Sequence, residues 1–366
     1  MKRDVRIDIA TSADDADIRG LLRREPLPGR IAISYEREPE FSIGCDATGD
    51  NATVLVAREI DTGETIGVAC RSEREVYVNG EPVRVGYLGQ LRIDRRYRGR
   101  WLVSRGFSRL RDLHDRDPLP AYLAAVTANN REAEGILVTR PRRVFPRFHP
   151  VADYCTLAVR VRRRPRPDHS RAEPAADLPE VARFLQTEGP RRQFFSVWNE
   201  RKLTSLTGRL GLRLDDIHVV RRNGSISGVM GLWDQSSYKQ HVVRAYSGWM
   251  RLASAFSQVA TPLLGHAPLP RAGENIRHGY AAFVCIANDD AVAFDDLLGA
   301  VMRRAAARDL DYVLLGMDAR DPLLPVAREH PHVLYRSTLY LAEWPDGGRL
   351  HARLDSRPTS VEVATL

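Results

Sequence analysis

Apolar positions along the chain recur with two periods, one typical of strands and one typical of helices. Residues 5–10 alternate as a strand, and residues 18–22 place apolar side chains at helical spacing. Several short strands follow, including the two arms of a hairpin predicted across Asn79-Gly80. Strand, helix, strand, helix and strand then succeed one another up to residue 161. This order predicts an α/β fold with a mixed sheet flanked by helices.

The segment 86–116 combines a predicted strand, a basic turn and a predicted helix. Residues 87–93 form a half-apolar run, and apolar residues recur at helical spacing from Val103 to Leu113. Between them, Gly99 is surrounded by four arginines, Arg95, Arg96, Arg98 and Arg100. A turn that opens directly into a helix presents unpaired backbone N–H groups at the positive end of the helix dipole. The segment therefore predicts a binding site for a phosphate or pyrophosphate.

The second half of the chain repeats the pattern of the first. The apolar residues of 18–22 recur in residues 181–185 at an offset of 163, and a second turn-linked strand pair surrounds Asn223-Gly224. Ile93 matches Ile286 at an offset of 193, which places an insertion at about residues 249–275. A repeat of this length indicates two copies of one domain.

The matching turn in the second copy lacks the phosphate-binding signature. It reads Ala-Asn-Asp-Asp over residues 287–290, with no glycine or arginine. Asp289 and Asp290 are good helix-starting residues, but their carboxylates would repel a pyrophosphate. We therefore expect a nucleotide cofactor to bind only in the first copy.

The pattern divides the chain into four parts. Residues 1–161 and 174–345 form the two predicted domains. Residues 162–173 are basic, rich in proline and without periodicity, which indicates a linker. Residues 346–366 lack a clear pattern and are predicted to be a weakly ordered tail.

Composition narrows the class of protein only in part. The net charge of +8 and the pI near 9.5 permit an anionic partner without choosing one. The four cysteines lie far apart with no Cys-x-x-Cys pair, so neither a disulfide framework nor a metal site is expected. The chain has neither an apolar run of the roughly 20 residues that a membrane helix needs nor an apolar leader, so we expect a cytoplasmic protein without a membrane partner.

The basic turn resembles the cofactor loop of the GNAT acyltransferases. Ile93, Tyr97, Arg98, Gly99 and Arg100 fall on the motif of that family, whereas residues 101 and 103 are Trp and Val in place of glycines. The resemblance implies two tandem GNAT-like domains, each with a mixed, mainly antiparallel sheet, and a degenerate second copy. It also implies that amides of this loop hold the pyrophosphate of acyl-CoA.

The resemblance implies further residues of the site. The cofactor-binding residues carried over by position are Leu91, Ile93, Arg98, Gly99, Arg100, Trp101, Leu102, Val103 and Asn130. The usual basic carboxylate falls near Gly89 and Gln90, and the usual tyrosine falls on Leu137, so neither proton-transfer residue is in its usual place. The candidates for proton transfer are then a water chain, Tyr87, Tyr97 or Glu75. Asn130 is also a natural helix cap.

These implications lead to three hypotheses for the function. The first is transfer of an acetyl or other acyl group from acyl-CoA to an amine, which could be a small molecule, an aminoglycoside-like compound or a protein amine. The second is a GNAT-fold protein that binds acyl-CoA or another ligand without catalysis, because Trp101 and Val103 could close the loop. The third is a transferase that uses aminoacyl-tRNA. A nucleic-acid partner is disfavoured because the arginines concentrate at a turn of nucleotide size.

Overall fold

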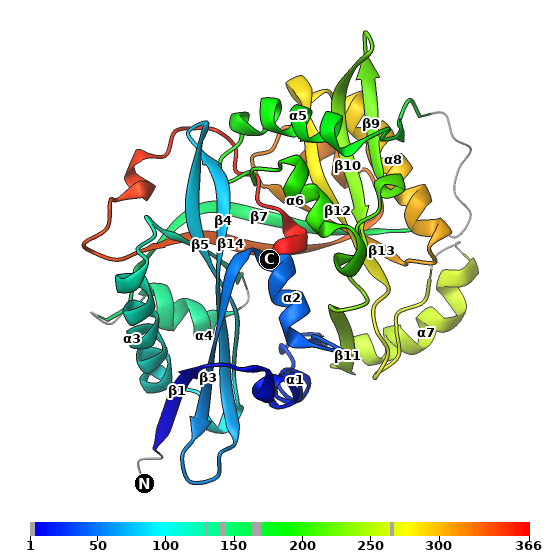
Figure 1. Cartoon of the computed structure of the whole chain (residues 1–366). Helices are drawn as coiled ribbons and strands as arrows, with labels where there is room; N and C mark the ends of the chain where they lie inside the picture. Colours follow the sequence, from blue (N-terminus) through cyan, green and yellow to red (C-terminus); the bar gives the residue numbers. More distant parts are fainter. Residues whose placement is uncertain (1–3, 129, 140–143, 163–169, 264–266) are drawn as a thin grey trace.

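The computed structural model describes residues 4–128, 130–139, 144–162, 170–263 and 267–366 (Figure 1). One mixed sheet of twelve strands runs through both halves of the chain. Its N-terminal strands are β1 (Val5–Ile9), β3 (Asp50–Glu59), β4 (Thr65–Val78), β5 (Glu81–Ile93), β6 (Tyr122–Thr127) and β7 (Arg147–Arg160). Its C-terminal strands are β8 (Glu173–Pro174), β9 (Ile217–Arg222), β10 (Ser225–Trp233), β12 (His278–Ile286), β13 (Tyr312–Asp318) and β14 (His332–Glu343).

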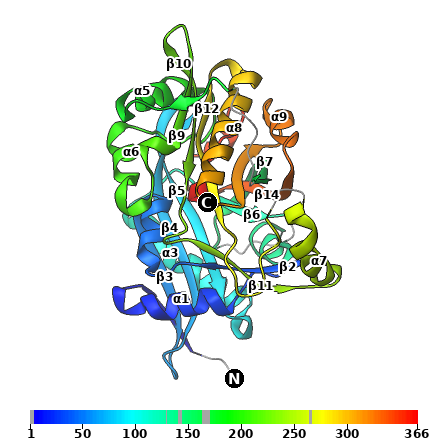
Figure 2. The ribbon, with the colours of Figure 1, turned by 90° about the vertical axis from the view of Figure 1, so that its right-hand side faces the viewer.

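The two halves exchange their last strands. The order in the sheet is β1-β3-β4-β5-β6-β14-β7-β13-β12-β10-β9-β8, so β14 completes the N-terminal half and β7 completes the C-terminal half. Strand β14 pairs with β6 and with β7, both antiparallel (Figure 2). Only β5 with β6 and β12 with β13 run parallel within the described sheet. The mixed, mainly antiparallel sheet is therefore confirmed, and the two copies share it.

Helices cover the sheet in both halves. The longer ones are α1 (Asp15–Arg24), α2 (Phe41–Thr48), α3 (Arg100–Arg116), α5 (Leu178–Glu188), α6 (Glu200–Leu206), α7 (Trp249–Leu263) and α8 (Ala291–Ala307), and the short ones are α4 (Arg131–Glu134) and α9 (Leu324–Arg328). Helix α8 illustrates the packing: Phe294, Leu297 and Leu298 are completely buried against the C-terminal strands. Burying each such side chain contributes about 1.5–3 kcal/mol. None of the helices in the described ranges is long and apolar enough to cross a membrane.

Several predicted details are confirmed by the structure. Strands β4 and β5 form the hairpin across Asn79-Gly80, with Val76 opposite Val83. The predicted insertion at residues 249–275 contains α7, and the strand β11 (Gln240–Tyr246) precedes it. Strand β11 pairs with β2 (Ile31–Glu36) of the N-terminal half and so forms a small second sheet that joins the halves.

Two details differ from the sequence prediction. Residues 346–366 are not a weakly ordered tail, because their last part packs between strands of the core and buries Val361, Val363 and Ala364. The expected linker 162–173 ends within a strand, since Glu173 pairs with Val219; most of that segment lies outside the described residues. The exchange of β7 and β14 also means that the predicted boundary at residue 161 is not a boundary of the sheet.

The exchange predicts how the chain behaves when it is cut. In a fragment of residues 1–165, strand β7 lacks both of its neighbours, β13 and β14, which belong to the other fragment. We expect residues 1–165 and 166–366 to be poorly folded when expressed alone and to form a 1:1 complex when expressed together. Near-ultraviolet circular dichroism and size-exclusion chromatography would measure this. A folded monomer of residues 1–165 alone would contradict the role that we give to the exchange.

Candidate functional site

Strand β5 contains an irregularity where a ligand could approach the backbone. Its register against β4 shifts between Gly89 and Arg92, and Gln90 has a positive φ of 58°. Pairing of β5 with the parallel strand β6 stops after Tyr87, opposite Leu123. The two strands therefore separate just before β5 leads into the basic turn and α3. A bulge next to a gap between strands is a common way to expose backbone groups to a ligand.

Arg95, Arg96 and Arg98 of the basic turn are paired with carboxylates of the protein itself, whereas the side chain of Arg100 lies outside the described part of the structure. Arg98 donates to Glu25 at 2.8 Å, and the backbone N–H of Arg95 donates to the same carboxylate at 3.2 Å. Arg96 binds Asp94 at 2.8 Å and Glu64 at 2.6 Å. Glu25 and Asp94 are both buried, and the Arg98 side chain is less exposed than that of Arg96, so the pair of Glu25 and Arg98 is the most shielded of these contacts. The clustering of arginines thus has a structural cause in addition to any anion.

The first residues of α3 divide between the surface and the core. Leu102 and Val103 are buried, Val103 beside Leu110 and Tyr122. Trp101 is 38% exposed, and its Cδ1 atom lies 3.4 Å from the place that a Cβ on Gly99 would take. Its indole therefore lies against Gly99 at the helix N-terminus and does not pack into the sheet. Helix α3 begins at Arg100, and no side chain caps it at Gly99.

The other predicted cofactor residues lie along the same path. Leu91 is 42% exposed on β5, whereas Ile93 is half-buried against the core under α3. Asn130 caps α4 by accepting a hydrogen bond from the backbone N–H of Ala133 at 3.1 Å. The predicted capping role of Asn130 is thus confirmed, and its role as a cofactor ligand stays a prediction. Its neighbour Asn129 lies outside the described residues.

The three predicted candidates for proton transfer do not come together. Tyr87 is buried under the Arg74 guanidinium, 3.9 Å from the ring centroid, and burial raises the pKa of its hydroxyl. Tyr97 is buried beside Leu102 in another cluster. Glu75 lies on the surface, where its carboxylate is 3.6 Å from Nζ of Lys202. No geometry in the described residues links these three groups into one site.

The C-terminal half repeats the irregularity of β5 but fills it. Phe283 on β12 has a positive φ of 58°, the register of β12 against β10 shifts there, and pairing with β13 stops after Tyr280. Gln90 and Phe283 differ by 193 positions, as do Ile93 and Ile286. This equivalence confirms the sequence alignment of the two copies. The backbone N–H of Phe283 donates to the Glu362 carboxylate at 2.8 Å.

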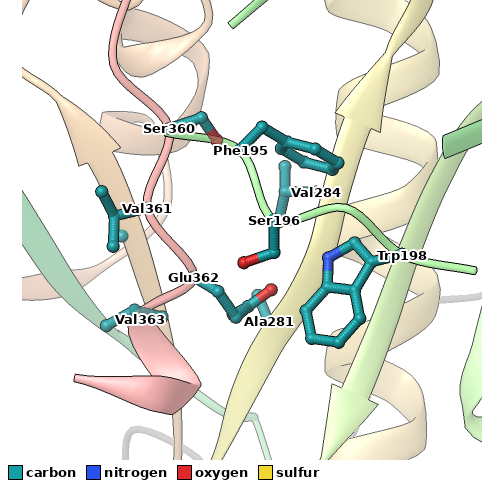
Figure 3. A pocket seen from close by; sticks show the side chains of 10 residues that line it. Phe195, Ser196, Trp198, Ala281, Val284, Ser360, Val361, Glu362 and Val363 are labelled. Atoms are coloured by element: carbon teal, nitrogen blue, oxygen red, sulfur yellow. The ribbon is translucent and has the colours of Figure 1, made fainter. Parts of the chain in front are cut away.

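The last residues of the chain thus occupy the gap in the C-terminal half. Figure 3 shows the Glu362 side chain next to Ala281, Ser196 and Trp198. Burial raises the pKa of Glu362 to about 7, against two backbone N–H hydrogen bonds that lower it. In the N-terminal half, no side chain of the described residues accepts a hydrogen bond from the backbone N–H of Gln90. The bulge at Phe283 is therefore occupied by the Glu362 carboxylate, whereas no carboxylate of the described residues binds the backbone N–H at the matching bulge at Gln90.

A buried group of aromatic and imidazole rings lies where the halves meet, and the sequence analysis did not identify it. The rings of Tyr35 and His241 have centroids 4.4 Å apart, and those of His241 and His278 stack at 4.3 Å. Nε2 of His278 lies 3.3 Å from the hydroxyl of Tyr280. Tyr35 also lies under the guanidinium of Arg92 on β5, at 5.6 Å. The group thus extends from the second copy to the strand that carries the bulge.

Burial, with help from nearby positive charges, keeps the imidazoles of this ring group neutral. Burial is the main reason that the pKa of His241 lies well below its usual range, and His278, Lys239 and Arg37 add repulsion. Burial likewise lowers the pKa of His278 to about 4. Nε2 of His241 has no hydrogen-bond partner among the described residues. The imidazole of His241 is therefore neutral near pH 7, and its free nitrogen binds a proton only weakly.

Buried cations surround the end of the chain beside the ring group. Nζ of Lys239 donates to the main-chain oxygens of Ala364 and Leu366, each at 3.2 Å. Arg74 donates to the main-chain oxygens of Thr48, at 2.7 Å, and of Thr365. Burial lowers the pKa of Lys239 well below its usual range. Main-chain oxygens therefore replace carboxylates as the partners of these cations.

The lowered pKa of His278 predicts an acid-sensitive stability. The unfolded chain binds a proton at His278 near pH 6.5, whereas the folded chain does so only near pH 4. Stability from this group is therefore complete above pH 6.5 and falls as the pH drops toward 4, by roughly 2.5 kcal/mol at pH 4.5. Urea unfolding at pH 7 and 4.5 should show a smaller loss in His278→Gln than in the wild type.

The control for this experiment is His330→Gln, which changes a more accessible imidazole paired with Asp295. Glu362 contributes with the opposite sign, because its raised pKa favours protonation in the folded chain, but it is present in every variant. Equal losses in His278→Gln and the wild type would show that His278 does not control the acid response.

Comparisons with known proteins show the fold. No family model and no curated protein matches the sequence. Saccharomyces cerevisiae N-myristoyltransferase with bound myristoyl-CoA is similar in structure, with a TM-score of 0.63, 11% identity, and 99% of this chain and 89% of that chain covered. A GCN5-related glucosamine N-acetyltransferase region of a fungal multi-domain GH3 β-N-acetylglucosaminidase has a TM-score of 0.59 and 14% identity, covering 93% of this chain and 38% of that one. The chain thus has the tandem GNAT fold that its sequence predicts.

Proposed function

We propose that this protein is an N-acyltransferase that moves an acyl group from acyl-CoA to an amine. The main support is the bulge at Gln90 on β5. At this point β5 separates from β6, and the chain then continues into the N-terminus of α3. This arrangement offers backbone groups to a thioester and helix amides to a pyrophosphate within one continuous segment. The likeness of the fold to a transferase with bound myristoyl-CoA supports it.

Different residues of the chain would bind different parts of acyl-CoA. The exposed edge of β5 around Leu91 would receive the pantetheine arm between the separated strands. Backbone N–H groups at the start of α3 would receive the pyrophosphate, because they have no intrahelical partners. Arg98 is 38% exposed at its side chain and would exchange part of its pairing with Glu25 for a phosphate oxygen. We leave the acyl chain length open between acetyl and longer groups.

The reaction requires a neutral amine and a place for its proton. The amine nitrogen attacks the thioester carbon, the new N–C bond forms as the C–S bond breaks, and the CoA sulfur leaves as a thiolate that is then protonated. We infer that the ring group at the junction of the halves takes the proton from the amine. We assign this role to His241 because its Nε2 has no hydrogen-bond partner among the described residues and Tyr35 lies between it and Arg92 of β5. The burial and positive charge that keep His241 neutral also make it a weak base, so it would hold the proton only briefly.

The acceptor would approach from the junction of the halves. Both the small sheet of β2 and β11 and the residues at the end of the chain meet the ring group there. A small-molecule amine and a protein amine both remain possible acceptors in this proposal. The cavity-filling Glu362 leaves the C-terminal half without an equivalent acyl-CoA site.

The proposed function first predicts how acyl-CoA binds. Isothermal titration with acetyl-CoA and longer acyl-CoAs should give one site per chain. Arg98→Ala should weaken binding about tenfold through the loss of one charge-assisted hydrogen bond, worth about 1.5 kcal/mol. Arg191→Ala is the matched control, because Arg191 lies beside Asn288 in the equivalent turn of the second copy.

Two results would contradict this assignment. One is a second site, or a single site that Asp289→Ala removes and Arg98→Ala leaves intact. The other concerns the indole that lies against Gly99. If the wild type binds no acyl-CoA at millimolar concentration but Trp101→Gly binds, then Trp101 closes the loop and the protein is not a transferase in its present form.

The second prediction concerns proton transfer. His241→Gln should lower kcat about 100-fold or more while acyl-CoA affinity stays within twofold, since general-base catalysis typically contributes 10²–10⁴-fold. Acetyl or longer acyl transfer to a panel of amines, followed by release of free CoA thiol, provides the assay. His330→Gln should retain full activity. Unchanged turnover in a folded His241→Gln protein would remove His241 from the mechanism.

The same assays separate the other two hypotheses. Tight acyl-CoA binding without release of thiol on any amine of the panel would favour a binding protein. Transfer from aminoacyl-tRNA, with an affinity that falls steeply with salt, would favour the RNA-dependent transferase.

A further inference from the structure

Three possible metal ligands lie close together where β14 ends beside β7. His149 lies on β7, Glu343 at the end of β14, and His351 in a short 3-10 helix at Leu350–Arg353. Strand register places His149 opposite Leu341, so that its side chain shares a face with Glu343 two residues further along β14. The ligand atoms of the three residues all lie within 4.8 Å of one another.

We propose that His149, Glu343 and His351 bind a divalent ion of the zinc class. Nothing in the proposed acyl transfer uses these residues, and the proposal does not rest on that function. Two imidazole nitrogens and one carboxylate oxygen form a ligand set that suits Zn²⁺, which takes such ligands at about 2.0–2.2 Å.

Contacts among the three side chains hold them close together. One oxygen of Glu343 accepts a hydrogen bond from the backbone N–H of His351 at 2.7 Å, which fixes the carboxylate. The other oxygen lies 2.8 Å from Nδ1 of His351. The imidazole rings of His149 and His351 stack at a centroid distance of 3.5 Å with an interplanar angle of 5°. An imidazole nitrogen binds a metal in the plane of its ring, so at least one of the two rings would have to rotate out of the stack for both nitrogens to reach one ion. The hydrogen bonds of Glu343 to His351 already hold the carboxylate beside that position, and outer hydrogen bonds of this kind orient metal ligands.

The three ligands differ in burial, so the site would be closed on one side and open to solvent on the other. Glu343 is buried, whereas His149 and His351 are only half-buried, which leaves a path for an ion and a fourth position for water. Arg147 lies opposite Glu343 in the strand register, and its charge would lower the affinity somewhat. The ion would join β7, β14 and the segment that follows β14. It would thereby fix the start of the segment whose other end carries Glu362.

Titration of the full-length chain with Zn²⁺ tests the proposal. After treatment with a chelator and its removal, isothermal titration at pH 7.5 should show one ion per chain with a Kd of 10 μM or tighter. The thermal midpoint should rise on addition of Zn²⁺. Co²⁺ in place of Zn²⁺ should give visible absorption typical of nitrogen and oxygen ligands, without the near-ultraviolet charge-transfer band of a thiolate.

Substitutions identify the ligands. His351→Gln and His149→Gln should each weaken Zn²⁺ binding at least tenfold, and His330→Gln, which alters another imidazole–carboxylate pair, should leave it unchanged. Glu343→Gln preserves the shape of the side chain and should also weaken binding. Circular dichroism in the chelator would confirm that each variant is folded.

Three results would overturn the proposal. They are a failure to bind Zn²⁺ at 100 μM, an affinity that the three substitutions leave intact, and a thiolate band that assigns the ion to cysteines. In each case the three residues would form an ordinary ion pair beside stacked rings.

Discussion

The antiparallel pairing of β7 with β14 is the interaction on which the rest of the structure depends. It runs from His332 opposite Val159 to Glu343 opposite Arg147 and buries Leu157, Leu339 and Leu341 in the middle of the sheet. Strand β7 comes from the N-terminal half of the sequence and β14 from the C-terminal half, and each lies in the other half of the sheet. The halves therefore cannot separate without opening two strand edges. The pairing therefore fixes the junction where the ring group lies. It also fixes the starting point of the C-terminal segment, since that segment follows β14 directly.

Residues 346–366 make the bulged strands of the two similar halves different, because they occupy only the C-terminal one. Both halves contain a strand with a residue of positive φ, Gln90 or Phe283, beside a parallel neighbour that separates from it. In the C-terminal half the backbone N–H of Phe283 already has a carboxylate partner in Glu362. Two backbone hydrogen bonds partly compensate for the burial of that carboxylate, and a pKa near 7 allows it to be neutral for part of the time. Under the proposed function, the C-terminal copy would lack an acyl-CoA site because its gap is occupied as well as because its turn has no arginine.

The sequence predicted what depends on local patterns. Helical and strand periods revealed the repeat, and the offset of 193 that aligned Ile93 with Ile286 also aligns the two bulged positions. The exchange of β7 and β14 was missed because alternation shows which face of a strand is buried and not which strand lies beside it. The role of the arginines was only partly understood, since the carboxylate of Glu25 that holds Arg98 lies far away in the sequence. The side-chain direction of Trp101 could not follow from its spacing.

The ring group where the two halves meet shows most clearly why such a cluster has no recognisable motif in the sequence. Tyr35 and His241 are separated by some 200 positions and meet only because β2 pairs with β11. The cations around them, Lys239 and Arg37, have no carboxylate partners in the described part of the chain and contact main-chain oxygens instead. Their charge adds to the burial that keeps His241 unprotonated. Burial is thus the main cause of the neutral imidazole of His241, and the neighbouring buried cations add to it. Main-chain oxygens of residues 364–366 accept hydrogen bonds from Lys239 and Arg74 and so compensate for the burial of these charges.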